Sequence, residues 1–356
     1  MPSMNNKNTK VKILILFLVV VGFITTFITG FILARLLASE ARGGMIRVAP
    51  GKNDIAFPVL EDDNLPTVPQ DSTKFIPGKH YFDDTIILVS KKDPSINLVA
   101  TVTRSEQDGS YTQGTRVSFF DGASWDRKTT SQKTDSSSIV SNGIVKSWNV
   151  QIDPTRVLKQ TVDGEVTVNK KTIQFTSGIL QNEISVRSLP GYTKFMSEGM
   201  GTITVEGTSY DAYVLYTRIY SLNASDIQFY SEPLGLTTDW MIFWDSAGNF
   251  YHADVTNVQK PTDIYQTHEL GILKDPQGAV SKTFNVSVTR DGLTPPKDYT
   301  ISFGESLNAK LNFQRIDELN KAPDGSFQWF IGNIDGKIEK NGQFIPGKGL
   351  IEYIHN

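Results

Sequence analysis

The sequence predicts an all-β protein on the basis of three features. Short runs rich in β-branched and aromatic residues recur after residue 80, and their lengths are typical of strands. Pairs of Asp or Asn followed by Gly separate many of these runs, and such pairs supply the positive φ angles of tight hairpins. No long apolar pattern with the helical period follows residue 80, so few helices are expected there.

Residues 13–37 are predicted to form a transmembrane helix ahead of the β-rich part. Residues 13–34 carry no charge, and this run of 22 residues reaches the roughly 20 that a helix needs to cross a bilayer. A cleaved secretory signal peptide is the alternative, because Lys7, Lys10 and Lys12 precede the run. The apolar core of a signal peptide normally spans only about 7–15 residues. An uncleaved anchor is therefore favoured, with the membrane lipid bilayer as the expected partner.

The charges beside this helix do not decide its orientation, because arginines follow it almost as densely as lysines precede it. The short N-terminal tail and the signal-like layout favour a single-pass protein of the cell membrane with an extracytoplasmic C-terminal domain. Small residues recur every fourth position along the helix, at Gly22, Thr26, Gly30, Ala34 and Ala38. Such a stripe promotes close helix contact, so self-association through the helix and chance alignment are both open.

The remaining chain is divided by a stalk and by a boundary near residue 195. Residues 1–12 are predicted to be a cytoplasmic tail, and residues 38–80 a stalk that glycines and prolines punctuate. Residues 81–195 and 196–356 each hold a series of predicted strands, whose even spacing indicates a barrel or a sandwich. The polar tract 128–138 is predicted to be a long surface loop.

Composition and motifs exclude several classes of function. The chain carries 35 basic and 38 acidic residues without a basic block, so nucleic acid is not an expected partner. The absence of cysteine excludes disulfides and thiolate metal sites. No phosphate loop, dinucleotide fingerprint or nucleophile elbow is present, so no cofactor is expected. His252 and Asp254 share a strand face, which is interpreted as a solvated polar face rather than a metal site.

Several stretches of the second block carry a family resemblance. Residues 329–336 and 346–353 look like a closing hairpin, residues 201–207 like a glycine-flanked strand, and residues 238–248 like a Trp-Asp-Trp strand with its turn. In these stretches the chain resembles the hydroxyneurosporene synthase (carotenoid 1,2-hydratase)/AttH-like family. The resemblance implies two consecutive lipocalin-like antiparallel β-barrel halves, and relatives that include enzymes acting on apolar terpenoids or polyketides.

The residues that perform hydration in that family are absent at the corresponding place. The hydratases carry an Asp-His-Glu-Trp motif in the strand before the Trp-Asp-Trp segment, whereas this chain has residues 216–220, Tyr-Thr-Arg-Ile-Tyr, in about that position. The acid and the imidazole that would protonate a double bond are therefore missing. A non-catalytic role is favoured, and the question of enzyme activity stays open.

Four aromatic residues are predicted to line an apolar ligand site, namely Tyr216, Trp240, Trp244 and Tyr251. Larger barrels leave room for a small hydrophobic molecule, although ordinary core packing accounts for such residues as well. Trp240 and Trp244 are expected to point into the interior of the second barrel, with Ile242 facing outward.

Three functions from different classes follow from these features. The favoured one is a membrane-anchored extracytoplasmic lipocalin-like protein that binds a hydrophobic small molecule or lipid without catalysis. The second is an isomerase, hydratase or cyclase of the same fold that acts on an apolar terpenoid or polyketide. The third is a structural cell-surface protein whose barrels have filled interiors.

Overall fold

The computed structural model describes the β-rich part of the chain and one short segment ahead of it. The described residues are 46–48, 81–107, 110–134, 139–152, 160–189, 192–221, 236–258, 268–283, 285–304, 307–321, 327–340 and 342–355. The predicted tail, the predicted transmembrane helix and most of the stalk lie outside them. Every helix or strand in the described residues is a β-strand, so the prediction of an all-β class is confirmed. No helix long and apolar enough to cross a membrane occurs in these ranges.

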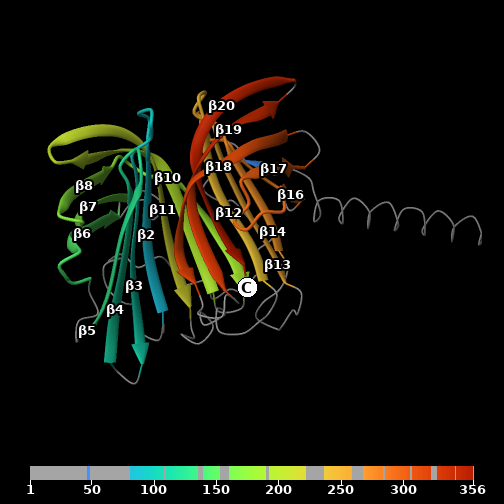
Figure 1. The fold of residues 1–356 in the computed structure, drawn as a ribbon. Coiled ribbons are helices and arrows are strands. Elements are labelled where there is room, and N and C mark those ends of the chain that lie inside the picture. The colour runs from blue at the N-terminus through green and yellow to red at the C-terminus, as the bar shows by residue number, and fades with distance from the viewer. Residues whose placement is uncertain are drawn as a thin grey trace, which may run out of the picture.

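The first half of the fold is a curled antiparallel sheet (Figure 1). Its strands, in the order in which they pair, are β5 (Trp125–Thr134), β4 (Ser110–Phe120), β3 (Asn97–Gln107), β2 (Tyr81–Ser90), β11 (Thr208–Ser221), β10 (Tyr192–Val205), β8 (Lys171–Ser177), β7 (Gln160–Val168) and β6 (Val145–Ile152). A further strand, β9 (Gln181–Leu189), pairs with β10 outside this order. The sheet curls enough for Lys171 of β8 to reach Asp126 of β5, at 3.2 Å.

The second half is a second antiparallel sheet with the same order of strands. Its members, in pairing order, are β1 (Ile46–Val48), β15 (Val280–Thr283), β14 (His268–Lys274), β13 (Phe250–Val258), β12 (Leu236–Asp245), β20 (Gln343–His355), β19 (Gln328–Lys340), β18 (Leu307–Lys321), β17 (Asp298–Phe303) and β16 (Val286–Arg290). Apart from β1 and β9, β2 of the first sheet corresponds to β12 of the second, and β11 corresponds to β20. The two halves are therefore repeats of one arrangement. The predicted boundary near residue 195 lies within β10, a strand of the first sheet.

Part of the polar tract predicted to be a surface loop is a strand instead. Residues 128–134 belong to β5, which pairs with β4 from Phe120↔Trp125 to Tyr111↔Thr134. All ten side chains of β5 are exposed or half-buried, because β5 is the outermost strand of its sheet. A strand at the edge of a sheet needs no apolar alternation to be held by the hydrogen bonds of its neighbour, so hydrophobicity did not reveal it.

Three apolar layers hold the fold together. Alternate residues of each strand point to opposite faces of a sheet, so one face of each sheet lines the interior of its own half. In β2, Ile86 and Leu88 face the interior of the first half, whereas Ile87 and Val89 face the other half. The third layer lies between the halves and joins apolar residues of both sheets.

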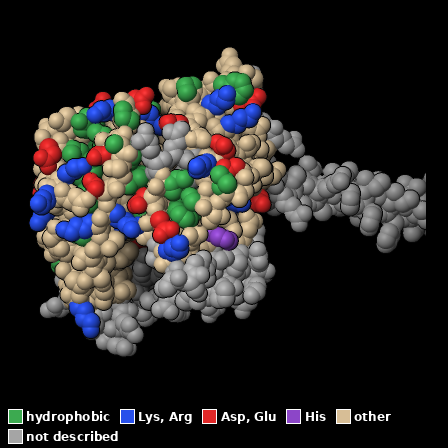
Figure 2. Space-filling view, viewed as in Figure 1, with side chains coloured by type: hydrophobic (Ala, Val, Ile, Leu, Met, Phe, Trp, Pro, Cys, Tyr) green, Lys and Arg blue, Asp and Glu red, His purple; other side chains and the backbone are tan. Residues whose placement is uncertain are grey.

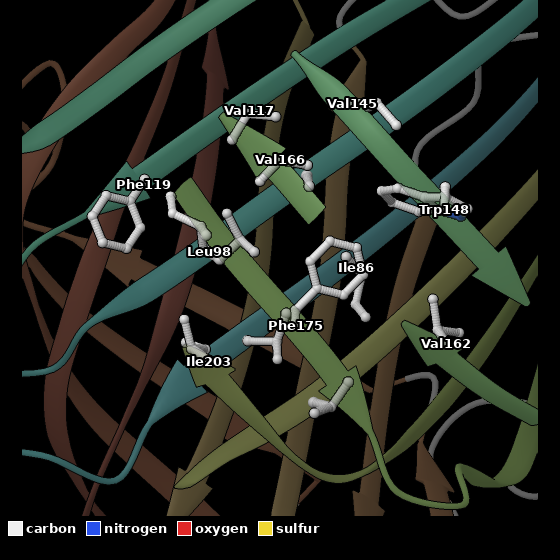
Figure 3. Packing of buried hydrophobic residues seen from close by; sticks show 14 of the residues in the cluster. Ile86, Leu98, Val117, Phe119, Val145, Trp148, Val162, Val166, Phe175 and Ile203 are labelled. Carbon is white, nitrogen blue, oxygen red and sulfur yellow. The ribbon is translucent and has the colours of Figure 1, made fainter. Parts of the chain in front are cut away.

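The interior of the first half is filled by side chains from facing strands (Figure 3). Trp148 of β6 meets Phe175 of β8 edge to face, with ring centroids 5.4 Å apart. Gly164 of β7 lies under this pair, and a Cβ atom added there would come within 2.5 Å of the Phe175 ring. A glycine is required at this position because the ring occupies the space of a side chain.

The layer between the halves contains polar contacts as well as apolar packing. The rings of Tyr213 and Trp244 stack across it, with centroids 5.2 Å apart and planes 7° from parallel. The Nδ2 group of Asn97 donates a hydrogen bond of 2.7 Å to Oδ1 of Asn333 in the other half. Lys274 of the second half forms a largely buried ion pair with Glu198 of the first. The two sheets thus pack as one body through their outer faces.

The described surface is mixed in charge. Figure 2 shows acidic and basic side chains interspersed over the face that it displays. Large exposed apolar side chains in the described residues are spread over separate segments, namely Ile179, Met200, Leu293 and Phe344. The buried apolar residues of the described ranges are therefore gathered mainly in the three internal layers.

Replacing Gly164 by Ala should destabilise the protein, because the added methyl group has to displace the Phe175 ring or the facing backbone. Overpacking of this kind typically costs about 1–3 kcal/mol of the free energy of unfolding. Chemical denaturation followed by circular dichroism measures the change. Thr176→Ala, at an exposed position of β8, is the control and should shift the free energy by no more than about 0.5 kcal/mol. Equal stability of the two variants would show that the interior is loosely packed.

Candidate functional site

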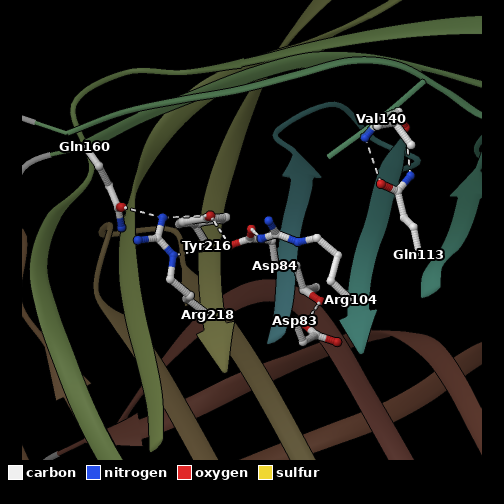
Figure 4. Close-up of polar contacts among 9 residues, drawn as sticks. Asp83, Asp84, Arg104, Gln113, Val140, Gln160, Tyr216 and Arg218 are labelled. Atoms are coloured by element: carbon white, nitrogen blue, oxygen red, sulfur yellow. Dashed lines mark hydrogen bonds and ion pairs between the residues drawn. The ribbon is translucent and has the colours of Figure 1, made fainter. Parts of the chain in front are cut away.

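A cluster of charged and polar side chains lies inside the first half, beside its apolar interior (Figure 4). Asp84 of β2, Arg104 of β3, and Tyr216 and Arg218 of β11 form its centre, and each is at most 1% exposed. We call these four residues the Asp84 cluster. They share strand faces with apolar interior residues, since Asp84 is two positions from Ile86 on β2.

The pairing of strands brings these side chains together. Arg218 lies directly opposite Asp84 in the register of β11 and β2, and Arg104 lies on the neighbouring strand on the other side. Arg218 donates from Nε to Oδ1 of Asp84 at 3.2 Å, and Arg104 donates from Nη2 to Oδ2 at 3.2 Å. The hydroxyl of Tyr216 donates a short hydrogen bond to Oδ1 of the same carboxylate. One carboxylate therefore receives bonds from three donors on two strands.

The network extends across the interior from Arg218. Its Nη2 group donates to the hydroxyl oxygen of Tyr216 at 2.9 Å and to Oε1 of Gln160 at 3.3 Å. Gln160 of β7 in turn donates to Oγ of Ser197 on β10, at 2.8 Å. These bonds fix the orientation of the Arg218 guanidinium, because the side chains that hold it are themselves buried and bonded.

Burial controls the protonation of the Asp84 cluster. It raises the pKa of Asp84 above its ordinary value, although the charges of Arg218 and Arg104 act in the opposite direction. Burial also raises the pKa of Tyr216 well above its ordinary value, so this hydroxyl remains a donor. Arginine stays charged in proteins. The cluster thus directs fixed donors at the carboxylate of Asp84 in apolar surroundings, and the hydroxyl of Tyr216 keeps its proton on the hydrogen bond to this carboxylate.

A smaller cluster occupies the corresponding place in the second half. Asp239 is the fourth residue of β12, as Asp84 is the fourth residue of β2, and both are fully buried. Arg290 of β16 donates to both carboxylate oxygens of Asp239, with 3.0 Å from Nε to Oδ1. The Arg290 side chain is 23% exposed, and its guanidinium lies 5.8 Å from the centre of the Tyr353 ring. This site holds one cation for one anion and is more open to solvent than the Asp84 cluster.

The four aromatic residues that the sequence singled out do not meet at one place. Tyr216 lies in the interior of the first half, and Tyr251 lies in the interior of the second, where its hydroxyl donates to Oδ2 of Asp245 at 2.8 Å. Trp240 and Trp244 belong to the layer between the halves. The structure therefore provides no single apolar site formed by all four.

The expected orientation of the two tryptophans is wrong. Ile242 lies between Trp240 and Trp244 at two-residue spacing, so all three share one face of β12, and that face points to the first half. Met241 and Phe243 point into the second interior instead. All five residues from Trp240 to Trp244 are apolar. Only the packing of the first sheet against β12 therefore distinguishes the two faces of this strand.

The layer between the halves also contains two buried titratable residues. His252 is fully buried and lies within 2.8 Å of the Met241 carbonyl oxygen through Nδ1, so its interpretation as part of a solvated face is wrong. Lys282 of β15 is 2% exposed, and burial lowers its pKa to about 6. Both residues face the same side of the sheet, in one row of the register with Ile272 between them. Within the described ranges, no group of His, Asp and Glu side chains is arranged to hold a metal ion.

Sequence reasoning missed most of the Asp84 cluster. Asp84, Arg104 and Gln160 were not singled out, and Arg218 appeared only as part of a segment that departs from a family motif. The sequence did contain a signal for two of these buried charges. Asp84 is two positions before the apolar Ile86, and Arg104 is two positions after the apolar Val102, so each charge lies on the apolar face of its strand.

Comparison with known proteins identifies the fold. No protein-family model and no curated relative matches the sequence. The protein assigned as AttH in Nitrosomonas europaea superimposes with a TM-score of 0.56 at 12% identity, covering 80% of this chain and 95% of that one. Kievitone hydratase from Nectria haematococca superimposes with a TM-score of 0.51 at 12% identity, covering 83% of this chain and 94% of that one. The chain thus shares the fold of these two proteins, and its two antiparallel β-sheet halves agree with the fold that the family resemblance implies.

Replacing Lys282 by Met should remove a pH dependence from the stability of the protein. Burial holds the pKa of Lys282 at about 6 in the folded protein, whereas an unfolded lysine titrates near about 10.4. Between these values the unfolded chain binds more protons. The free energy of unfolding of the wild type should therefore rise with pH, by up to about 1.4 kcal/mol per pH unit from this residue.

Chemical denaturation at several pH values from about 6.5 to 8.5 measures this slope. Lys282→Met should show a smaller slope and should be most stabilised, relative to the wild type, at the lowest pH. Lys310→Met removes an exposed lysine of β18 and serves as the matched control, with an unchanged slope. Identical slopes for Lys282→Met and the wild type would show that Lys282 is charged in the folded protein.

Proposed function

We propose that the protein binds a small, largely apolar molecule without chemical change, and that the Asp84 cluster contacts the polar group of this molecule. The observation that carries the proposal is the concentration of fixed hydrogen-bond donors in an otherwise apolar interior. Apolar surfaces with a few convergent polar groups are typical of small-molecule sites. The similarity in fold to kievitone hydratase supports the proposal, because the name of that protein describes it as a hydratase of kievitone.

The energetic cost of the Asp84 cluster supports a functional role. Removing a charged group from water costs several kcal/mol even in real proteins, and well-packed apolar side chains often replace a buried ion pair without loss of stability. Asp84, Arg104 and Arg218 are nevertheless all at least 99% buried inside the first half. A role in binding a ligand would explain why these three positions carry charges, although apolar side chains could stabilise the fold equally well.

Two alternatives each have an observation in their favour. The Tyr216–Asp84 pair can hold and move a proton, which favours an isomerase, hydratase or cyclase of the same fold acting on a terpenoid or polyketide. The dense packing around Gly164 and Phe175 favours a structural role with a filled interior. A ligand recovered unchanged supports binding, a converted ligand supports catalysis, and the absence of any ligand supports the structural role.

Native mass spectrometry of the full-length protein, purified in a mild detergent, tests the binding proposal. We expect one apolar molecule per chain, and we expect Arg218→Met to reduce its occupancy because the anchoring donor is lost. Lys310→Met, outside the cluster, should leave occupancy unchanged. A protein that retains no molecule, and that takes up neither hexadecanol nor hexadecanoic acid when these are supplied, would contradict the proposal.

We also propose that residues 13–37 anchor the protein in the cell membrane, with the two β-sheet halves outside the cytoplasm. The support is the uncharged run in the sequence, which lies outside the described residues. Removal of residues 1–42 should release a soluble protein whose circular dichroism is dominated by strands. The full-length chain is the control and should sediment with membranes. Full-length protein that stays in solution without detergent after ultracentrifugation would contradict an anchor.

A further inference from the structure

We infer that the second half, rather than the first, lies against the bilayer, and that the tip of the β19–β20 hairpin contacts the phospholipid headgroups. The inference rests on the anchor proposed for residues 13–37, and it adds which surface of the folded part meets the lipid. We call the exposed side chains of Lys337, Lys340 and Phe344 the hairpin tip.

The first argument is the place at which the chain joins the folded part. β1 precedes every other strand in the sequence, yet it pairs with β15 of the second sheet, and Ile46 lies opposite Lys282. Residues 38–45 alone separate β1 from the end of the proposed anchor. A fully extended chain advances at most about 3.6 Å per residue, so Ile46 lies within about 30 Å of that end. The second half is therefore held beside the membrane, although the first half comes earlier in the sequence.

The second argument is that the hairpin tip and Ile46 lie at the same end of the second half. Ile46 pairs next to the end of β15 at Thr283, and β16 begins shortly afterwards at Val286. One row of paired residues crosses the sheet from there to the hairpin tip, namely Val286, Phe303, Leu307, Lys340 and Gln343. Neighbouring strands are about 4.8 Å apart, so this row spans about 20 Å along the sheet. A bilayer close to Ile46 is thus within reach of the hairpin tip.

The third argument is the composition of the hairpin tip. The Phe344 side chain is 50% exposed, and Nζ of Lys337 lies 4.2 Å from the centre of its ring. Lys340 is exposed as well, and the exposed Lys310 lies opposite Lys337 in the register of β18 and β19. Glu339 is the acidic residue among them, so the local charge is positive. A ring beside lysines suits a lipid surface, because the ring enters the apolar boundary while the ammonium groups stay among the phosphates.

The fourth argument is a difference between the two repeats. The β10–β11 hairpin corresponds to the β19–β20 hairpin in the order of strands. The two hairpins close in the same register, at the pairs Val205↔Thr208 and Lys340↔Gln343. By this register, Ser209 takes the place of Phe344, and Val205 takes the place of Lys340. Of these two hairpins, the one on the half that β1 joins is therefore the one with an aromatic ring and a lysine at these places.

Fluorescence quenching in a bilayer tests the inference. The chain has no cysteine, so a single introduced cysteine can carry one nitrobenzoxadiazole label. Gln343→Cys places the label at the hairpin tip, and Thr208→Cys places it at the corresponding exposed position of the first half. The full-length protein is reconstituted in nanodiscs of phosphatidylcholine and phosphatidylglycerol that contain lipid spin-labelled near the headgroup. Because interfacial aromatic rings sit at headgroup level, we expect at least about threefold stronger quenching at residue 343 than at residue 208.

A further substitution separates contact by the hairpin tip from simple proximity to the membrane. Phe344→Ser, combined with the label at residue 343, should lower the excess quenching to about half or less, because the ring no longer enters the apolar boundary. Leu293→Ser removes an equally exposed apolar side chain from the turn between β16 and β17, and it should leave the excess unchanged. Circular dichroism verifies that each variant is folded.

The outcomes distinguish the inference from the anchor on which it rests. Equal quenching at residues 343 and 208, or excess quenching that Phe344→Ser does not lower, would overturn the inference while the anchor stands. Protein that does not elute together with the nanodiscs in size-exclusion chromatography would contradict the anchor, and the inference with it.

Discussion

The packing of the two sheets through their outer faces sets the constraints under which the rest of the protein is built. A strand in the middle of either sheet is covered on both sides, by the interior of its own half and by the other half. In β12, the consecutive residues 241–244 are all at most 1% exposed. Such strands have no face open to water, so each polar side chain on them has to find a partner inside the protein.

The buried charges follow from this constraint. Asp84 and Asp239 occupy corresponding positions on corresponding strands, and each is bonded to arginine, but the partners come from different places in the two halves. In the first half the arginines lie on the strands next to Asp84, and in the second half Arg290 comes from the far end of the curled sheet. The two halves therefore share the position of the buried aspartate and differ in the arginines that bond to it. In the first half the buried acid is bonded to two arginines and a tyrosine, and in the second it forms an ion pair with a partly exposed arginine.

The layer between the halves contains both the contacts that join the two sheets and a buried residue that can titrate, Lys282. Stacked rings of Tyr213 and Trp244 and the Asn97–Asn333 bond fix the two sheets relative to each other. Lys282 in the same layer has a pKa lowered by burial, so protonation at low pH places a charge within an apolar interface. The same packing that joins the halves therefore also buries Lys282 and lowers its pKa.

The sequence by itself determined the all-β class, because β-branched runs and Asn-Gly or Asp-Gly turns are local signals that need no partner. It also predicted two antiparallel β-sheet halves through short stretches such as residues 329–336, whose glycines and aromatic residues resemble a family pattern. Tertiary structure alone decided which side of β12 is the interior, since five successive apolar residues give no alternation to follow. It also decided that β5 is a strand and that Arg104 and Arg218 meet at Asp84. These features depend on register and on the packing of one sheet against another, and some of them join distant parts of the chain, as where Arg218 meets Asp84 at a separation of 134 positions.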